Sequence, residues 1–173
     1  FTVLARLYAN QGRFDLAGLL SYRAMERFVE MGLQEIAPEF KMSDPVWGLI
    51  TDDESQLRMA YAKISSSGKD YLPNKVTLIS GLLVLAILDE TLGERFRNMR
   101  NRDTVNLLMS LANKRNRSYL AHGVNNLDEG DYRELHFGAT DLAKAILKDN
   151  YAEFELLCNQ LRPIELRKLL DNA

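Results

Sequence analysis

The spacing of the apolar residues is the feature that most constrains how this chain can fold. Over most of the sequence, apolar side chains recur at intervals of three and four residues, which is the period of an amphipathic α-helix. The 10 Gly and 4 Pro of the 173 residues fall mostly between these segments, where helices begin and end. No segment shows the alternation that is typical of a β-strand. We therefore predict an all-α fold.

The same pattern gives the helices their approximate bounds. Thr51 is expected to cap the third helix, because its hydroxyl is followed three residues later by Glu54, a pair that is typical of helix starts. Residues 76–88 have no polar face, which indicates a helix in the core of the bundle. The helices are expected over residues 2–10, 14–36, from Thr51 to about Ile64, and over 76–88, 103–121, 131–148, 151–161 and a segment after Pro163.

The composition excludes several classes of protein. A single Cys, Cys158, cannot form a disulfide within the chain, and two His with one Cys cannot complete a zinc site without carboxylates. The 22 Lys and Arg against 24 Asp and Glu give a net charge of −2, which argues against coating nucleic acid by overall charge. Residues 76–88 are too few to span a membrane. We expect a cytoplasmic protein with no metal, no cofactor and no membrane contact.

The length predicts one domain over residues 1–173, and the hydrophobic content of 46% is enough for a packed core. Phe1 stands where a complete chain would have Met, and no signal peptide is present. We therefore expect this domain to have been excised from a longer chain.

One helix carries a stripe that changes from apolar to polar in its last two turns. The stripe of the expected helix 103–121 continues through Arg115, Tyr119 and His122. Seven steps of about 100° bring Arg115 and His122 to within about 20° of one line along the helix, whereas Arg117 lies about 140° from His122. Arg115 and His122 are therefore expected to face the same surface. A histidine that binds the last carbonyls of a helix, or a solvated basic face, is the alternative explanation.

Residues 115–123, Arg-Asn-Arg-Ser-Tyr-Leu-Ala-His-Gly, resemble the R-x(4 to 6)-H motif of HEPN domains, in which Asn, Asp or His typically follows the Arg. Here Asn116 follows Arg115, and six residues separate Arg115 from His122. Together with residues 22–26, Tyr-Arg-Ala-Met-Glu, the block resembles the helical effector half of CRISPR-associated ribonucleases of type III systems. Those proteins join an N-terminal CARF sensor domain to a C-terminal HEPN domain. The resemblance implies a HEPN-like helical bundle with additional C-terminal helices.

The resemblance also implies an endoribonuclease that cleaves single-stranded RNA without a metal ion. His122 is the candidate general base or acid, because an imidazole with a pKa of about 6.5 can take a proton from a ribose 2′-hydroxyl near neutral pH. Arg115 would hold the phosphate, and Asn116 would orient His122 or the phosphate. The candidate substrate-binding residues are Lys114, Arg117 and Tyr119.

HEPN ribonucleases of this kind bring two motifs together across a two-fold axis, so the resemblance implies a homodimer with a composite active site. The partners would be single-stranded RNA and a second copy of the chain. A cyclic oligoadenylate would act only through a sensor domain that this chain does not contain. Such a protein would serve in antiviral defence.

Two other functions stay open at this point. A HEPN-like domain could bind RNA or a protein without cutting. The order of Tyr8, Gly12, Phe14 and Ala17 is also that of a tetratricopeptide helix pair, a peptide-binding scaffold, but the pattern does not recur after about 34 residues.

The remaining basic and acidic residues are given structural interpretations. His136 has no Arg-Asn partner at motif spacing and is expected to pack or to lie on the surface. The arginines over residues 95–102 could extend an RNA path, although a solvated connection explains them as well. Asp128 and Glu129 are expected to be loop charges rather than metal ligands.

Overall fold

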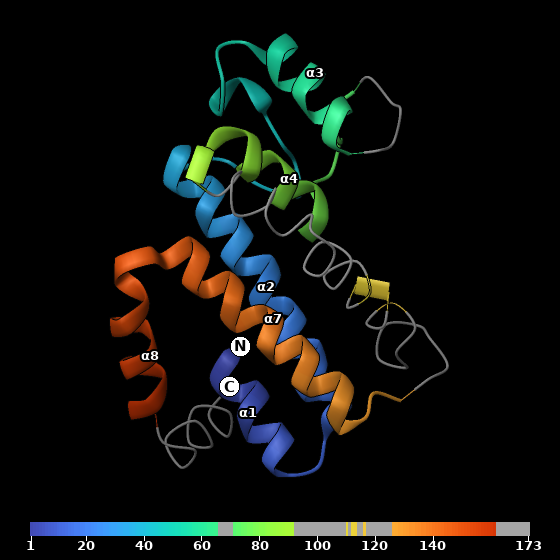
Figure 1. Ribbon diagram of the computed structural model, residues 1–173, viewed down its shortest axis with the longest axis vertical. Coiled ribbons are helices and arrows are strands. Elements are labelled where there is room, and N and C mark those ends of the chain that lie inside the picture. Colours follow the sequence, from blue (N-terminus) through green and yellow to red (C-terminus); the bar gives the residue numbers. More distant parts are fainter. Residues whose placement is uncertain (66–70, 92–109, 111, 114–115, 117–125, 162–173) are drawn as a thin grey trace. The chain divides into compact units, whose positions relative to one another are not determined.

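The computed structural model describes residues 1–65, 71–91, 110, 112–113, 116 and 126–161. All regular elements within these ranges are helices and none is a strand, which confirms the predicted all-α fold. Figure 1 shows them in chain order from blue to red. They are α1 (Thr2–Asn10), α2 (Phe14–Ile36), the 3-10 helix η1 (Trp47–Leu49), α3 (Glu54–Ile64), α4 (Leu78–Leu88), α7 (Glu129–Leu147), the 3-10 helix η3 (Lys148–Asn150) and α8 (Tyr151–Gln160).

Residue contacts divide the chain into two compact units. The first consists of residues 1–25 and 110–173, and the second of residues 26–109. The 23-residue helix α2 contributes to both units, because the division falls between Met25 and Glu26. The single-domain organisation expected from the length stays a prediction.

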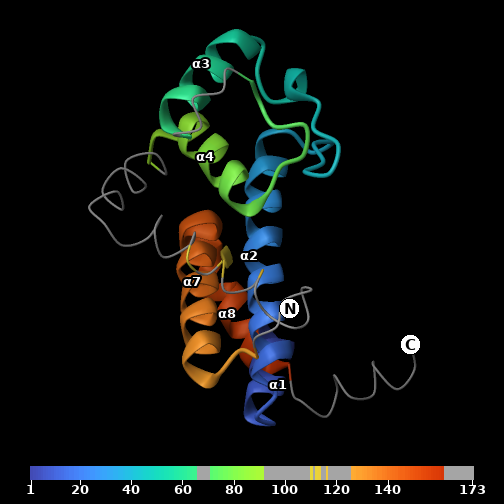
Figure 2. The ribbon, with the colours of Figure 1, turned by 90° about the vertical axis from the view of Figure 1, so that its right-hand side faces the viewer.

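In the first unit, α1 and α7 lie side by side and α8 folds back along α7 (Figures 1 and 2). Ala5 of α1, Ala17 of α2 and Tyr132 of α7 form a buried cluster. A carboxylate oxygen of Asp15 accepts a hydrogen bond of 2.5 Å from the backbone N–H of Leu127, next to the N-cap of α7. This bond ties the start of α7 to the start of α2.

In the second unit, α3 and α4 pack together, and α4 also lies against α2. The contact with α2 centres on Gly81, which is buried in α4. A Cβ atom added to Gly81 would lie 2.5 Å from Cγ1 of Val29 and 3.1 Å from Cγ1 of Val76. The close approach of α4 to α2 therefore requires a residue without a side chain at this position.

The core of both units includes one face of α2. Its fully buried residues are spaced four apart, slightly more than one helical turn, and so share one side of the helix. They are Ala17, Ser21, Met25, Val29 and Leu33, each 0% exposed. Residues 76–88 were predicted to be core, and burial of Leu78, Leu82 and Val84 confirms this.

The bounds of α1 and α2 agree with the prediction, but the cap predicted for the third helix is wrong. Asp53, not Thr51, caps α3, because its carboxylate accepts a hydrogen bond of 2.9 Å from the N–H of Gln56. The Thr51 hydroxyl instead accepts a bond of 3.1 Å from the N–H of Asp53. Thr51 thus shapes the turn before the helix, and the helix begins at Glu54.

Side-chain caps also move the starts of two other helices. Thr77 and Ser80 form a capping box, so α4 begins at Leu78 and not at residue 76. Asp128 and Asp131 form another capping box, so α7 begins at Glu129 and not at residue 131. The interpretation of Asp128 and Glu129 as loop charges is therefore wrong: one caps the helix, and the other begins it.

The helix predicted over residues 103–121 is described at four positions. Residues 110, 112, 113 and 116 are all helical, in agreement with the prediction at those positions. The rest of that helix, the arginines over residues 95–102 and the helix expected after Pro163 lie outside the described residues. None of the described helices is long and apolar enough to cross a membrane.

Replacing Gly81 with Ala is expected to lower the free energy of unfolding by about 1 kcal/mol, because overpacking against Val29 and Val76 outweighs the gain in helix propensity. Urea unfolding followed by circular dichroism measures the change. Gly48→Ala is the matched control, since its added Cβ atom would meet nothing within 4 Å. A Gly81→Ala chain as stable as the wild type would contradict the tight packing of α4 on α2.

Candidate functional site

Of the predicted site residues, the structure describes Asn116 alone. It is helical and exposed, as expected for a residue on the outer part of this helix. The structure therefore does not test whether the site residues come together. Those that lie outside the described residues are Lys114, Arg115, Arg117, Tyr119 and His122.

The second sequence block that carried the HEPN resemblance lies within α2. Tyr22, Ala24 and Met25 are buried there, whereas Arg23 is exposed. The apolar members of this block thus belong to the core, and its arginine faces outward from the helix.

The second histidine of the chain has the surroundings of a packing residue. The ring of His136 stacks on Tyr132 with the centroids 5.4 Å apart, and its Nδ1 is buried without a hydrogen-bond partner in the described part of the chain. Burial lowers the pKa of His136 below its usual 6.5, and the positive charge of Arg6 lowers it further. His136 is therefore neutral near pH 7, in line with the structural interpretation made from the sequence.

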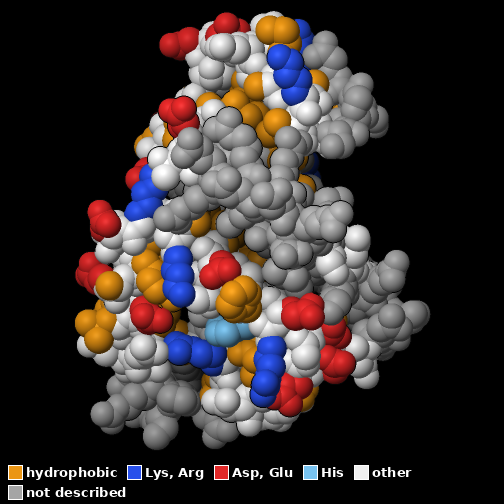
Figure 3. Space-filling view, in the orientation of Figure 1, with side chains coloured by type: hydrophobic (Ala, Val, Ile, Leu, Met, Phe, Trp, Pro, Cys, Tyr) orange, Lys and Arg blue, Asp and Glu red, His pale blue; other side chains and the backbone are white. Residues whose placement is uncertain are grey.

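Arg6 joins α1 to the end of α8. Its guanidinium donates hydrogen bonds of 3.0 Å to the side-chain oxygen of Asn159 and of 3.0 Å to the carbonyl of Cys158. A cation at this place also interacts favourably with the negative end of the α8 dipole. Figure 3 shows basic and hydrophobic side chains next to one another on the visible face of the first unit. The sequence pattern gave no sign of this contact, because Arg6 and Asn159 are 153 residues apart.

Cys158 does not have the character of a nucleophile. Burial raises the pKa of its thiol, and the nearby Arg6 only partly opposes that effect. The described residues also contain no group of three or more His, Cys, Asp or Glu side chains that could hold a metal ion.

A family model described as the Csm6 HEPN domain matches residues 2–146. This match covers well over half of the chain and includes both blocks that carried the resemblance. The chain belongs to the Csm6 HEPN domain family. Membership confirms the resemblance to a HEPN domain of a CRISPR-associated protein and supports, at the level of the family, a HEPN nuclease. No curated protein and no solved structure gives a significant match to the chain.

This Csm6 HEPN domain also contains a pocket that the sequence analysis missed. The pocket has a volume of about 420 Å³ and lies in the second unit. Its residues come from three segments without a common motif, and the only sequence signal was the single Trp of the chain near several polar residues. The residues that line it are Asp44, Pro45, Trp47, Glu54, Arg58, Tyr71, Leu72 and Asn74.

Replacing Arg6 with Met is expected to lower the free energy of unfolding by about 1–2 kcal/mol, because both hydrogen bonds to the end of α8 are lost. Urea unfolding of the variant measures this. Arg133→Met is the control, since Arg133 is 75% exposed and pairs with an exposed Glu129 within one helix. It is expected to cost less than about 0.5 kcal/mol. Equal losses in the two variants would show that Arg6 does not hold α1 to α8.

The lowered pKa of His136 predicts a pH dependence of stability. Because the unfolded chain binds this proton more readily, the contribution of His136 to the free energy of unfolding is fully present above pH 6.5 and is lost as the pH drops through 6.5 toward the folded pKa. Replacing His136 with Phe keeps a ring on Tyr132 and removes this proton, so the variant should lose less stability between pH 7.5 and 5.5. Urea unfolding at both pH values gives the comparison. Equal pH dependence in variant and wild type would contradict the lowered pKa.

Proposed function

We propose that this Csm6 HEPN domain is a metal-independent endoribonuclease that cleaves single-stranded RNA in type III CRISPR antiviral defence. The observation that carries the proposal is the family match over residues 2–146, because that range contains the complete segment from Arg115 to His122. A HEPN family with an intact R-x6-H spacing supports nuclease activity more strongly than RNA binding alone. We also infer that the protein acts in the cytoplasm.

In the proposed reaction, His122 acts as the general base. It takes the proton from a ribose 2′-hydroxyl, and the resulting oxygen attacks the adjacent phosphorus. The bond from phosphorus to the 5′-oxygen breaks, and that oxygen leaves with a proton from a general acid. The products are a 2′,3′-cyclic phosphate and a 5′-hydroxyl, and DNA is not cut because it lacks the 2′-hydroxyl.

The neighbouring side chains of the motif serve the phosphate. Arg115 binds the scissile phosphate through charge-assisted hydrogen bonds and stabilises the charge of the transition state. Asn116 orients the phosphate or His122. The exposure of Asn116 on the helix supports a role at a surface that RNA can reach. Lys114 and Arg117 bind the RNA backbone on either side of the scissile phosphate by charge. Tyr119 binds the RNA by stacking on a base.

A second copy of the chain completes the site. The mechanism needs both a base and an acid near neutral pH, and each chain has one histidine in the motif. A homodimer whose two motifs face one groove supplies both, with His122 of the partner subunit as the acid. A CARF sensor domain joined to this domain would bind a cyclic oligoadenylate and raise the activity of this site.

The test is cleavage of fluorescently labelled single-stranded RNA in the presence of EDTA. Replacing either Arg115 or His122 with Ala is expected to slow cleavage by a factor of about 10² or more, because each change removes a group that acts on the reacting atoms. A substrate with 2′-deoxyribose at the cut position should stay intact. The products should carry the cyclic phosphate, which mass spectrometry detects.

Two matched variants control for changes in charge and folding. His136→Phe removes the histidine outside the motif, and Arg133→Ala removes an exposed arginine of α7. Both should cleave at the wild-type rate at pH 7.5. Unchanged cleavage by His122→Ala, or cleavage that requires an added divalent metal, would overturn the proposed mechanism. RNA binding without any cleavage by the wild type would indicate a non-catalytic HEPN module.

A further inference from the structure

The pocket of the second unit has the size of a small-molecule site. Its volume of about 420 Å³ falls in the range of about 300–1,000 Å³ that is typical of pockets for small ligands. Three segments form its walls: the loop that leads into η1, the first two turns of α3, and the segment before α4.

Two of its walls are aromatic. Trp47 is 8% exposed and packs on the fully buried Phe40, with the ring centroids 5.5 Å apart. Tyr71, which also lines the pocket, is 53% exposed. The exposed tyrosine ring and the small exposed part of the fixed indole give the pocket an aromatic side, which suits a flat aromatic ligand.

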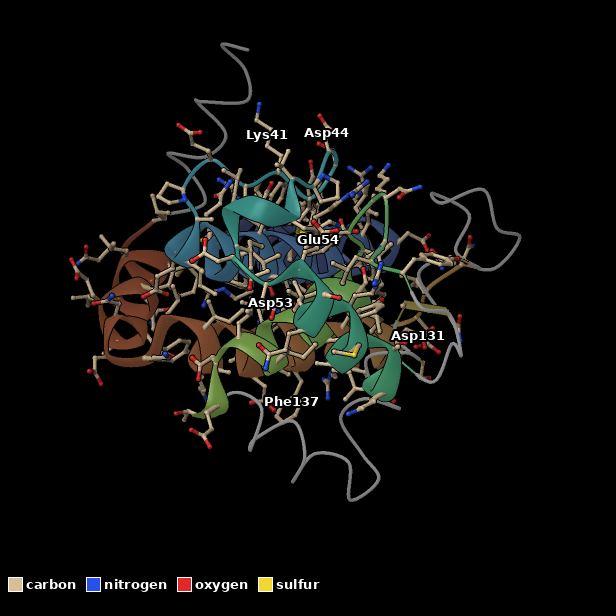
Figure 4. All side chains as sticks on the ribbon, turned by 90° about the horizontal axis from the view of Figure 1, so that it is seen from above. Lys41, Asp44, Asp53, Glu54, Asp131 and Phe137 are labelled. Atoms are coloured by element: carbon tan, nitrogen blue, oxygen red, sulfur yellow. The ribbon has the colours of Figure 1, made fainter. Side chains whose placement is uncertain are left out.

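The polar lining combines hydrogen-bond acceptors and donors. Asp44 and Glu54 contribute carboxylates from different elements, the loop before η1 and the first turn of α3 (Figure 4). Arg58 follows Glu54 by one turn of α3 and contributes donors, and Asn74 contributes both kinds of group. Two carboxylates against one guanidinium, counted over the described lining, disfavour a phosphate group inside the pocket, so the base of a nucleotide and not its phosphate would enter. The positive charge of the Arg58 guanidinium in turn disfavours a cationic ligand.

The walls are held in place before any ligand binds. The N–H of Val76 donates a hydrogen bond of 2.8 Å to the carbonyl of Met42, which joins the segment before α4 to the loop before η1. Leu72, in the pocket wall, is 7% exposed. The cap from Asp53 to Gln56 fixes the start of α3 and with it the position of Glu54. A pocket formed in this way loses little entropy on binding.

We propose that this pocket binds a guanine base. Guanine is neutral and flat, and its Watson–Crick edge presents adjacent N1–H and N2–H donors that suit a carboxylate of Asp44 or Glu54. Its O6 and N7 atoms accept hydrogen bonds from groups such as the guanidinium of Arg58. Adenine lacks the adjacent donors and is expected to bind more weakly. The base stacks on Tyr71, beside the small part of Trp47 that is exposed.

Trp47 reports binding directly, because it is the only Trp of the chain and lines the pocket. The chain, carrying His122→Ala so that RNA stays intact, is titrated with guanosine monophosphate, adenosine monophosphate and N-acetylarginine amide. Tryptophan fluorescence is recorded with correction for ligand absorbance. Saturable quenching by guanosine monophosphate is expected at concentrations about 10-fold lower than for adenosine monophosphate. Equal binding of the two nucleotides, tighter binding of the arginine amide, or no saturation would overturn the proposal.

Variants separate stacking from recognition of the base edge. Replacing Tyr71 with Ala should weaken the binding of both nucleotides about 10-fold, because a stacking surface is lost. The double variant Asp44→Asn and Glu54→Gln should weaken guanosine monophosphate and leave adenosine monophosphate nearly unchanged. Its matched control is Glu39→Gln with Asp52→Asn, two exposed acids of the same unit that do not line the pocket. An equal effect of the two double variants would contradict recognition by Asp44 or Glu54.

The guanine could belong to a free nucleotide or to an RNA chain, and one further titration distinguishes these sources. A single-stranded oligouridine with one guanine is compared with guanosine monophosphate. Tighter binding of the oligonucleotide assigns the pocket to RNA, and equal affinity assigns it to a free nucleotide. Because binding is read from Trp47 in a chain without His122, absence of nuclease activity in the wild type would leave this result unaffected.

Discussion

The buried face of α2 is the constraint on which both units depend. Its fully buried residues, spaced four apart from Ala17 to Leu33, contribute to the core of the first unit at one end and of the second unit at the other. At two close contacts of α2 one partner has no side chain: a Cβ atom added to Gly18 of α2 would lie 2.5 Å from Leu127, and one added to Gly81 of α4 would lie 2.5 Å from Val29. Ser21 lies within the same face, and its hydroxyl has no hydrogen-bond partner in the described part of the chain, so that a polar group is buried at some cost. The packing therefore depends on the small size of a few residues as much as on the apolar character of the rest.

The helices could be predicted because helical periodicity is a local property. The bounds of α1 and α2 follow from the apolar pattern and from breaks at Gly12 and Pro38. The starts of later helices depend on which of several neighbouring side chains accepts a backbone hydrogen bond. Thr51 and Asp53 both suit a cap by residue type, and the structure gives that role to Asp53. Residue spacing alone does not distinguish between two such candidates, since the outcome depends on the path of the chain before the helix.

The sequence motif and the pocket of the second unit also differ in how far they could be predicted from the sequence. The motif from Arg115 to His122 could be found from the sequence because its residues lie within one short stretch of the chain, and the family match supports it. The pocket of the second unit combines Asp44, Glu54 and Tyr71, which only the folding of three segments brings to one place. The contact between Arg6 and the end of α8 likewise joins opposite ends of the described chain. Sequence patterns identify sites within one element and miss those that tertiary contacts assemble.

The surroundings of His136 bear on the proposed chemistry. Burial and the charge of Arg6 lower its pKa below the usual 6.5, so that little of it carries a proton to donate near pH 7. Burial raises the pKa of the Cys158 thiol, so that little thiolate is present near pH 7 to accept a proton. The reaction proposed above removes one proton and returns another, and it uses one imidazole in each chain, that of His122. Two-fold symmetry supplies the second imidazole without any further residue, and for this reason the proposed mechanism requires a dimer.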